Sequence, residues 1–123
     1  MATFSKIDLS EAVDGMGIAV VATASTGTLI HNMDTDDTAD YDEVWLYVTN
    51  VHSGDEVLTI QWGTTGGVND ITQTVATKAG LVLVVPGLVL KGNASVQKNI
   101  RAFNPSGASS RLIIHGYVNR ITG

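Results

Sequence analysis

Apolar and polar residues alternate with a period of two along most of this chain, and no window sustains the 3.6-residue period of an amphipathic helix. Val44, Leu46 and Val48 fall on one face of the clearest alternating segment. Trp45 and Tyr47 fall on the other face. Because successive side chains of a strand point to opposite sides, this alternation indicates strands with one face turned to a core. The chain is therefore predicted to be all-β.

Turn-forming residues separate the alternating segments at intervals of about 8–12 residues, which is typical of a β-sandwich or jelly roll. The expected strands are 17–24, 28–31, 43–51, 56–62, 70–76, 81–90 with a bend at Pro86-Gly87, 96–103 and 111–121. We expect the turn at 52–55 to close a hairpin and a short turn of helix near 10–13. About eight antiparallel strands predict one jelly-roll or β-sandwich domain, residues 15–123, after a short extended N-terminal arm, residues 1–14.

Charge is divided sharply along the sequence. All 12 acidic residues lie at or before Asp70, with one lysine, so that segment has a formal charge of 1 − 12 = −11. The remaining six basic residues follow with no acid, and −11 + 6 gives the net charge of −5. Within one short domain, this division indicates contacts between complementary surfaces, either inside the fold or between copies. Charged residues make up only 15% of the chain, which favours a surface partly covered by neighbours.

Several classes of partner are disfavoured by composition. The chain has no cysteine, so disulfides and thiolate metal sites are excluded. A pI near 4.8 argues against general nucleic-acid binding. No apolar run approaches the length needed to span a bilayer. We therefore expect neither nucleic acid nor membrane as a partner.

No pattern typical of a reaction centre occurs, so we expect no enzymatic activity, no cofactor and no metal. His31, His52 and His115 have no metal-ligand spacing and are expected at strand ends or subunit contacts. The acidic segment 34–43 is the one cluster with cation-ligand chemistry, but it lacks the glycine of an EF-hand loop. We interpret it as a solvated loop that aids solubility or meets a basic neighbour.

Aromatic residues leave two interpretations open. Trp45, Tyr47 and Trp62 could form a platform for stacking on a sugar. Aromatic side chains also dominate the interiors of β-sandwiches and the contacts between proteins, which favours a core or interface role.

The segment 81–90 is apolar on both sides of the expected strand, so its two faces should both be covered, one by the core and one by something else. Pro86 cannot donate to a ladder and is expected at a bend or an edge. We predict a subunit interface here, formed by Leu81, Val82, Leu83, Val84, Val85, Leu88 and Leu90.

Most of the chain from about residue 17 resembles a known family. The similarity rests on TLIH at 28–31, DEVWLYV at 42–48, LTIQWG at 58–63, AGLVLVVPG at 79–87 and IHGYVNR at 114–120. In these segments the chain resembles the small head decoration, or cement, proteins of tailed bacteriophages. Those are single jelly-roll or β-sandwich proteins on the outside of icosahedral heads, often trimers.

The resemblance implies a non-enzymatic virion protein that is made in the host cytoplasm, forms a homotrimer and bridges coat subunits on the capsid exterior. Its partners would be itself and the major capsid protein. We predict capsid contacts from the arm and from the basic second half, namely Phe4, Ile7, Leu9, Arg101, Arg111 and Arg120. The alternative functions are a carbohydrate-binding or adhesion module and a tail or fibre-tip subunit of a phage particle.

Overall fold

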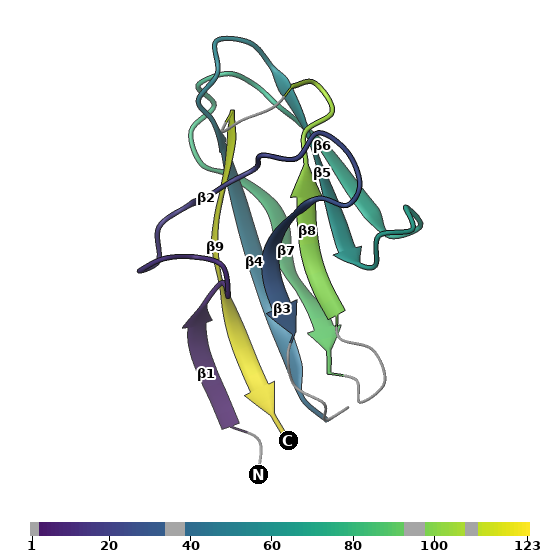
Figure 1. Cartoon of the computed structure of the whole chain (residues 1–123). Helices are drawn as coiled ribbons and strands as arrows, with labels where there is room; N and C mark the ends of the chain where they lie inside the picture. Colours follow the sequence, from purple (N-terminus) through teal and green to yellow (C-terminus); the bar gives the residue numbers. More distant parts are fainter. Residues whose placement is uncertain (1–2, 34–38, 93–97, 108–110) are drawn as a thin grey trace.

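Two antiparallel β-sheets packed face to face make up the protein in a computed structural model that describes residues 3–33, 39–92, 98–107 and 111–123 (Figure 1). The strands are β1 (Thr3–Asp8), β2 (Ile18–Ala19), β3 (Thr28–Met33), β4 (Tyr41–Asn50), β5 (Glu56–Gly63), β6 (Asp70–Val75), β7 (Val82–Lys91), β8 (Lys98–Phe103) and β9 (Leu112–Thr122). One sheet has the order β1-β9-β4-β7, with β2 also paired to β9, and the other has the order β3-β8-β5-β6. The prediction of an all-β fold is confirmed.

The pairing is nested, as a jelly roll requires. Both β1 and β2 pair with β9, and further inward β3 pairs with β8, β4 with β7 and β5 with β6. Because β1 and β2 lie along successive parts of β9, they act as one interrupted edge strand and the nine strands fill eight positions. A long hairpin rolled up in this way is the jelly-roll topology. The predicted architecture of about eight strands is therefore confirmed.

The prediction that the turn at 52–55 closes a hairpin is wrong. The strands β4 and β5 belong to different sheets, so this turn carries the chain across the sandwich at its upper end in Figure 1. Val44 and Leu46 on β4, and Leu58 and Ile60 on β5, are all fully buried in the core. Their apolar faces thus meet across the core instead of lying side by side in one sheet.

The expected strand at 17–24 is reduced to the two residues of β2. The backbone N–H groups of Val21 and Ala22 both donate to the Thr28 hydroxyl at 3.1 Å. Ala22 in turn accepts a bond from the backbone of Asn104 at 2.9 Å. These bonds to a side chain and a loop replace the ladder that a longer strand would need.

The N-terminal segment is paired along its first part. Each residue of β1 has a partner on β9, from Thr3 opposite Thr122 to Asp8 opposite Tyr117. The chain then turns at Leu9, whose carbonyl accepts a bond from the Ala12 N–H at 3.0 Å, so the expected turn of helix is a single hydrogen-bonded turn. The Leu9 side chain is buried in the core, so this turn is anchored to the sandwich.

The apolar segment around Pro86 forms one strand, β7, at the edge of its sheet. Its register against β4 shifts on both sides of the pair formed by Trp45 and Pro86. The expected position of Pro86 at an edge is therefore confirmed, since an edge strand tolerates a residue without an N–H. The described part of the predicted strand 96–103 begins at Lys98, and residues 96–97 lie outside the described residues.

Candidate functional site

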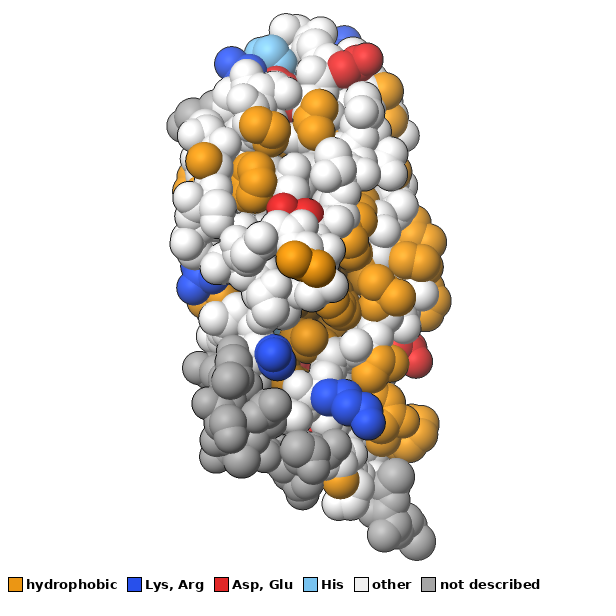
Figure 2. Space-filling view, turned by 90° about the vertical axis from the view of Figure 1, so that its right-hand side faces the viewer, with side chains coloured by type: hydrophobic (Ala, Val, Ile, Leu, Met, Phe, Trp, Pro, Cys, Tyr) orange, Lys and Arg blue, Asp and Glu red, His pale blue; other side chains and the backbone are white. Residues whose placement is uncertain are grey.

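The outward face of β7 carries exposed apolar side chains. Leu83 and Val89, opposite the outward residues Tyr47 and Glu43 of β4, are 45% and 47% exposed. Leu88, opposite the inward residue Val44, is 43% exposed at the sheet edge, and Leu81, just before β7, is 58% exposed. In Figure 2, which faces the edge of the molecule formed by β6 and β7, hydrophobic side chains run down the right-hand half of the surface. The inward face is part of the core, where Val85 is fully buried. Both faces of this strand were predicted to be covered, and in the isolated chain the outward face is open.

The other sheet edges differ from β7. The β1 edge includes the charged residues Lys6 and Asp8. The β3 edge is covered, since the Glu11 N–H donates to the Ile30 carbonyl at 3.4 Å. The β6 edge exposes the polar stretch 72–74. Charges and covering segments are the usual protection of an edge strand against association, and the long apolar face of β7 lacks them between its ends.

A row of stacked groups crosses the outer face of the same sheet. The Lys6 ammonium lies 4.3 Å from the Tyr117 ring centroid. The Tyr117 and Trp45 rings stack with centroids 6.3 Å apart and an angle of 11° between planes. On its other side the Trp45 ring lies against Gly87, where a Cβ atom would come within 2.9 Å of it. The half-buried Trp45 ring is thus flanked by Tyr117 and Gly87 within the chain.

This packing bears on the predicted sugar platform, because stacking on a sugar needs an open ring face. Trp62, on the other sheet, packs against the hydrophobic core. Tyr47 is half-buried on the outer face, in register between His115 and Leu83. The arrangement therefore favours the core and interface interpretation for Trp45 and Trp62.

A shallow groove of about 390 Å³ lies beside this row, between β1, β9 and β4. Its lining residues are Phe4, Ser5, Lys6, Glu43, Asn119 and Ile121. The Glu43 carboxylate accepts hydrogen bonds from Trp45 Nε1 at 2.8 Å and from the Asn119 amide at 3.1 Å. These two bonds, opposed by slight desolvation, hold the pKa of Glu43 below its usual value. Phe4, predicted to contact a capsid, is 73% exposed at the rim.

The basic residues predicted to contact a capsid have partners within the chain. Arg101 donates to the Gly27 carbonyl at 3.1 Å. Arg111 and Arg120 each bind a buried carboxylate, as described below. The two other predicted contact residues of the arm face the core, with Leu9 buried and Ile7 partly buried. Among the six predicted residues, Phe4 is therefore the one whose side chain is largely exposed.

The first buried carboxylate is Asp42, at the start of β4. Arg120 on β9 forms two bonds with it, Nε to Oδ1 at 2.8 Å and Nη2 to Oδ2 at 2.9 Å. His31 Nε2 lies 2.7 Å from Asp42 Oδ2. Burial alone would raise the pKa of Asp42, but the hydrogen bonds from Arg120 and His31 and the charge of Arg120 outweigh it, so the pKa lies below its usual value.

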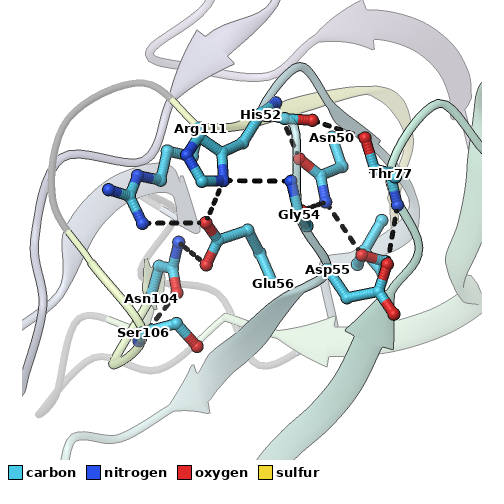
Figure 3. A network of polar contacts seen from close by, with 10 residues as sticks. Asn50, His52, Gly54, Asp55, Glu56, Thr77, Asn104, Ser106 and Arg111 are labelled. Atoms are coloured by element: carbon cyan, nitrogen blue, oxygen red, sulfur yellow. Dashed lines mark hydrogen bonds and ion pairs between the residues drawn. The ribbon is translucent and has the colours of Figure 1, made fainter.

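The second buried carboxylate is Glu56, at the start of β5 (Figure 3). Its Oε1 atom lies 2.9 Å from both His52 Nδ1 and Arg111 Nη1, and its Oε2 accepts a bond from the Asn104 amide at 3.4 Å. Around it, the Asn50 amide donates to the carbonyls of Gly54 and Val75 at 2.9 Å. This network ties together the loops at the end of the sandwich opposite the chain termini.

The two buried carboxylates pair the acidic segment of the sequence with the basic one. Asp42 and Glu56 come from the acidic segment, and Arg120 and Arg111 from the basic one. Complementarity within the fold, one of the two expected alternatives, therefore accounts for these pairs.

The interpretation of 34–43 as a solvated loop is wrong for its end, because Asp40 and Asp42 are buried. Residues 34–38 lie outside the described residues. His31 was expected at a strand end or a subunit contact but lies in the core, where a register shift of β3 buries both it and Ile30. One sequence signal could have indicated that Asp42 is buried: it lies two residues before Val44 and therefore on the same, inward face of β4.

Among the described residues, no group of three or more His, Asp or Glu side chains is arranged to hold a metal ion. Over the same residues, the fold offers no helix with the length and hydropathy to cross a membrane.

No protein-family model matches the chain, and no curated protein matches it. Among solved structures, a chain of one described as "Structure of infectious bursal disease virus Gt strain" is similar, with a TM-score of 0.45 and 13% sequence identity. The similarity covers 98% of the present chain and 33% of the other, so the present chain spans about a third of that chain's length.

Proposed function

We propose that this protein is a non-enzymatic structural protein of a virion, which decorates the outside of a phage capsid as a homotrimer and bridges the coat subunits. The observation that carries the proposal is the exposed apolar face of the edge strand β7. Exposed apolar patches of this kind mark protein contacts, and an unprotected edge strand invites association. The sequence resemblance to phage decoration proteins supports the same role.

A cyclic trimer needs a heterologous interface, in which two different patches of each copy meet. The face of β7 supplies one apolar patch of each copy, which would meet a different patch on the next copy and leave Phe4 at the β1 edge open. The major capsid protein is then the partner for surfaces that remain open in the trimer. Many copies with modest contacts would together reinforce a shell.

The carbohydrate-binding alternative has less support from the geometry, because Tyr117 and Gly87 flank the half-buried Trp45 ring and Trp62 packs against the core. A tail or fibre-tip subunit remains a second candidate, since the same self-associating edge would serve there.

The first test is the solution mass of the protein by size-exclusion chromatography with light scattering. We expect a trimer for the wild type and a monomer for Leu83→Asp, because Leu83 faces outward and is 45% exposed. Val68→Asp is the matched control, since Val68 is 90% exposed on the loop between β5 and β6, outside β7, and should leave the trimer intact. A wild-type monomer at all concentrations, or a trimer that survives Leu83→Asp, would contradict the proposed interface.

The capsid role is tested separately by sedimentation with phage heads stripped of their decoration. We expect the wild-type protein to sediment with the heads and Phe4→Ser to bind more weakly. Binding to tail fibres but not to heads would shift the assignment to the second candidate, and binding to neither would reject both.

A further inference from the structure

Both ring nitrogens of the buried residue His31 have defined partners. The backbone N–H of Ser10 donates to Nδ1 at 3.0 Å, and Nε2 lies 2.7 Å from Asp42 Oδ2. A backbone N–H can only donate and a carboxylate can only accept, so Nδ1 carries the lone pair and Nε2 the proton. His31 is therefore neutral in this arrangement, with its tautomer set by Ser10 and Asp42.

The bond from Ser10 belongs to a short clasp that joins the N-terminal segment to the edge of β3. The Ser10 hydroxyl accepts from the Asn32 N–H at 2.8 Å, and the Glu11 N–H donates to the Ile30 carbonyl at 3.4 Å. Leu9, just before the clasp, is 2% exposed within the core. The clasp thus covers the β3 edge and holds the Leu9 side chain in place.

Protonation of His31 would change this arrangement at one atom. A proton on Nδ1 places a donor opposite the donor of Ser10, so that hydrogen bond is lost. The new positive charge would also be buried beside Asp42, which Arg120 already neutralises through two bonds. A buried charge without full compensation favours an open state in which water reaches the ring.

Among the described residues, the charged groups around His31 form no bond with Nδ1. Asp42 on β4 and Arg120 on β9 face its Nε2 side. On β8, Lys98 is paired with Met33, two residues beyond His31. Before β4, the Asp40 carboxylate accepts from the Gly123 N–H at 3.1 Å.

We propose that His31 is an acid-sensitive latch: its protonation releases the clasp at residues 9–12 from the edge of β3. The ladder between β1 and β9 is separate from the clasp and stays formed. Release uncovers the Asn32 N–H and the Ile30 carbonyl, the backbone groups through which an edge strand accepts a further strand. The latch does not depend on the proposed virion role, so each proposal can be confirmed or rejected separately.

The test is amide hydrogen exchange by NMR between pH 7.5 and 4.5, expressed as protection relative to an unstructured chain. We expect protection at Ser10, Glu11 and Asn32 to fall by about tenfold for each pH unit below the titration of the ring, as linkage to one proton requires. Protection at Leu46 in the core should stay constant over the same range. Loss of protection at all sites together would instead show global unfolding and would overturn the latch.

The variant His31→Gln removes the titration but keeps an amide donor for Asp42 and a carbonyl acceptor for Ser10. We expect its clasp protection to be independent of pH, whereas His52→Gln, at the other buried carboxylate, should keep the wild-type dependence. If His31→Gln does not fold, the ¹⁵N shifts of the wild-type imidazole decide. Complete loss of clasp protection at the pH where the ring becomes protonated supports the latch, and either of these two events without the other overturns it.

Discussion

The two ends of the sandwich each hold a buried carboxylate bonded to one histidine and one arginine, but the two clusters differ in access to water. At Asp42, the His31 side chain is 1% exposed and that of Arg120 is 23% exposed. At Glu56, the His52 and Arg111 side chains are 36% and 34% exposed. The same three residue types thus form a sealed cluster at one end and a half-open cluster at the other.

This difference indicates that the burial of the partner side chains, more than their residue type, determines how much such a cluster contributes to stability. In the sealed cluster, the loss of a partner leaves a charge that water cannot reach, and this is costly. In the half-open cluster, water can replace a lost partner, and the remaining bonds still organise the loops. The sealed cluster is accordingly the place where a proton can act as a switch.

The largest effect is expected from removing the arginine at each end. Arg120→Met should lower the free energy of unfolding by about 3–5 kcal/mol, because Asp42 loses two of its bonds while fully buried. Arg111→Met should cost only about 1 kcal/mol, because Glu56 keeps its contacts with His52 and Asn104. Urea unfolding at pH 7 measures both values. Equal decreases in the free energy of unfolding would contradict the distinction between the sealed and the half-open cluster.

A smaller effect is expected in acid. The folded-state pKa of Asp42 is depressed, so its stabilising contribution is complete above the unfolded pKa of about 3.9 and is lost as the pH falls through the lower folded value. Asp42→Asn should therefore flatten the decline of the urea midpoint below about pH 4. Glu43, whose pKa is also lowered but which is only half-buried on the outer face, is the matched control. Glu43→Gln should flatten the decline less, and the reverse order would contradict the assignment.

The smallest effect is expected from salt. Raising sodium chloride from about 0.1 to 1 M shortens the screening length to about 3 Å, which weakens exposed charge pairs more than buried ones. The cost of Arg111→Met should fall by a few tenths of a kcal/mol, within the range typical of partly exposed pairs. The cost of Arg120→Met should stay constant. Urea unfolding of both variants in each buffer measures these costs. A cost of Arg120→Met that falls with salt would contradict the description of its cluster as sealed.

Much of the fold could be predicted from local patterns. The segments that became β4, β5, β6, β7 and β9 were recognised within a few residues from alternation alone. The failures have a common cause, namely bonds and strand pairings that the alternation of apolar and polar residues does not reveal. The segment 17–24 lost its ladder to the Thr28 hydroxyl, and the turn at 52–55 crosses the sandwich because β4 and β5 pair with other strands.

The sites were predicted less well than the strands. Outward residues of β7 such as Leu83 could be recognised because its apolar run exceeds what one core face needs. Arg111 and Arg120 were predicted to contact another protein, since their acidic partners lie 55 and 78 residues away along the chain. No local pattern links residues so far apart, and the interface and capsid assignments for β7 and Phe4 stay predictions.

The sequence by itself determined which side chains point inward on a regular strand, because the two-residue period of a strand is a local property of the backbone. It placed Val44, Leu46 and Val48 on the buried face, whereas Asp42, predicted to lie in a solvated loop, is buried beside them. Only the tertiary structure decided that Arg120 would meet this carboxylate and that a register shift would bury His31 beside it. Those contacts depend on how the rolled hairpin brings β3, β4 and β9 together, which is a property of the whole chain.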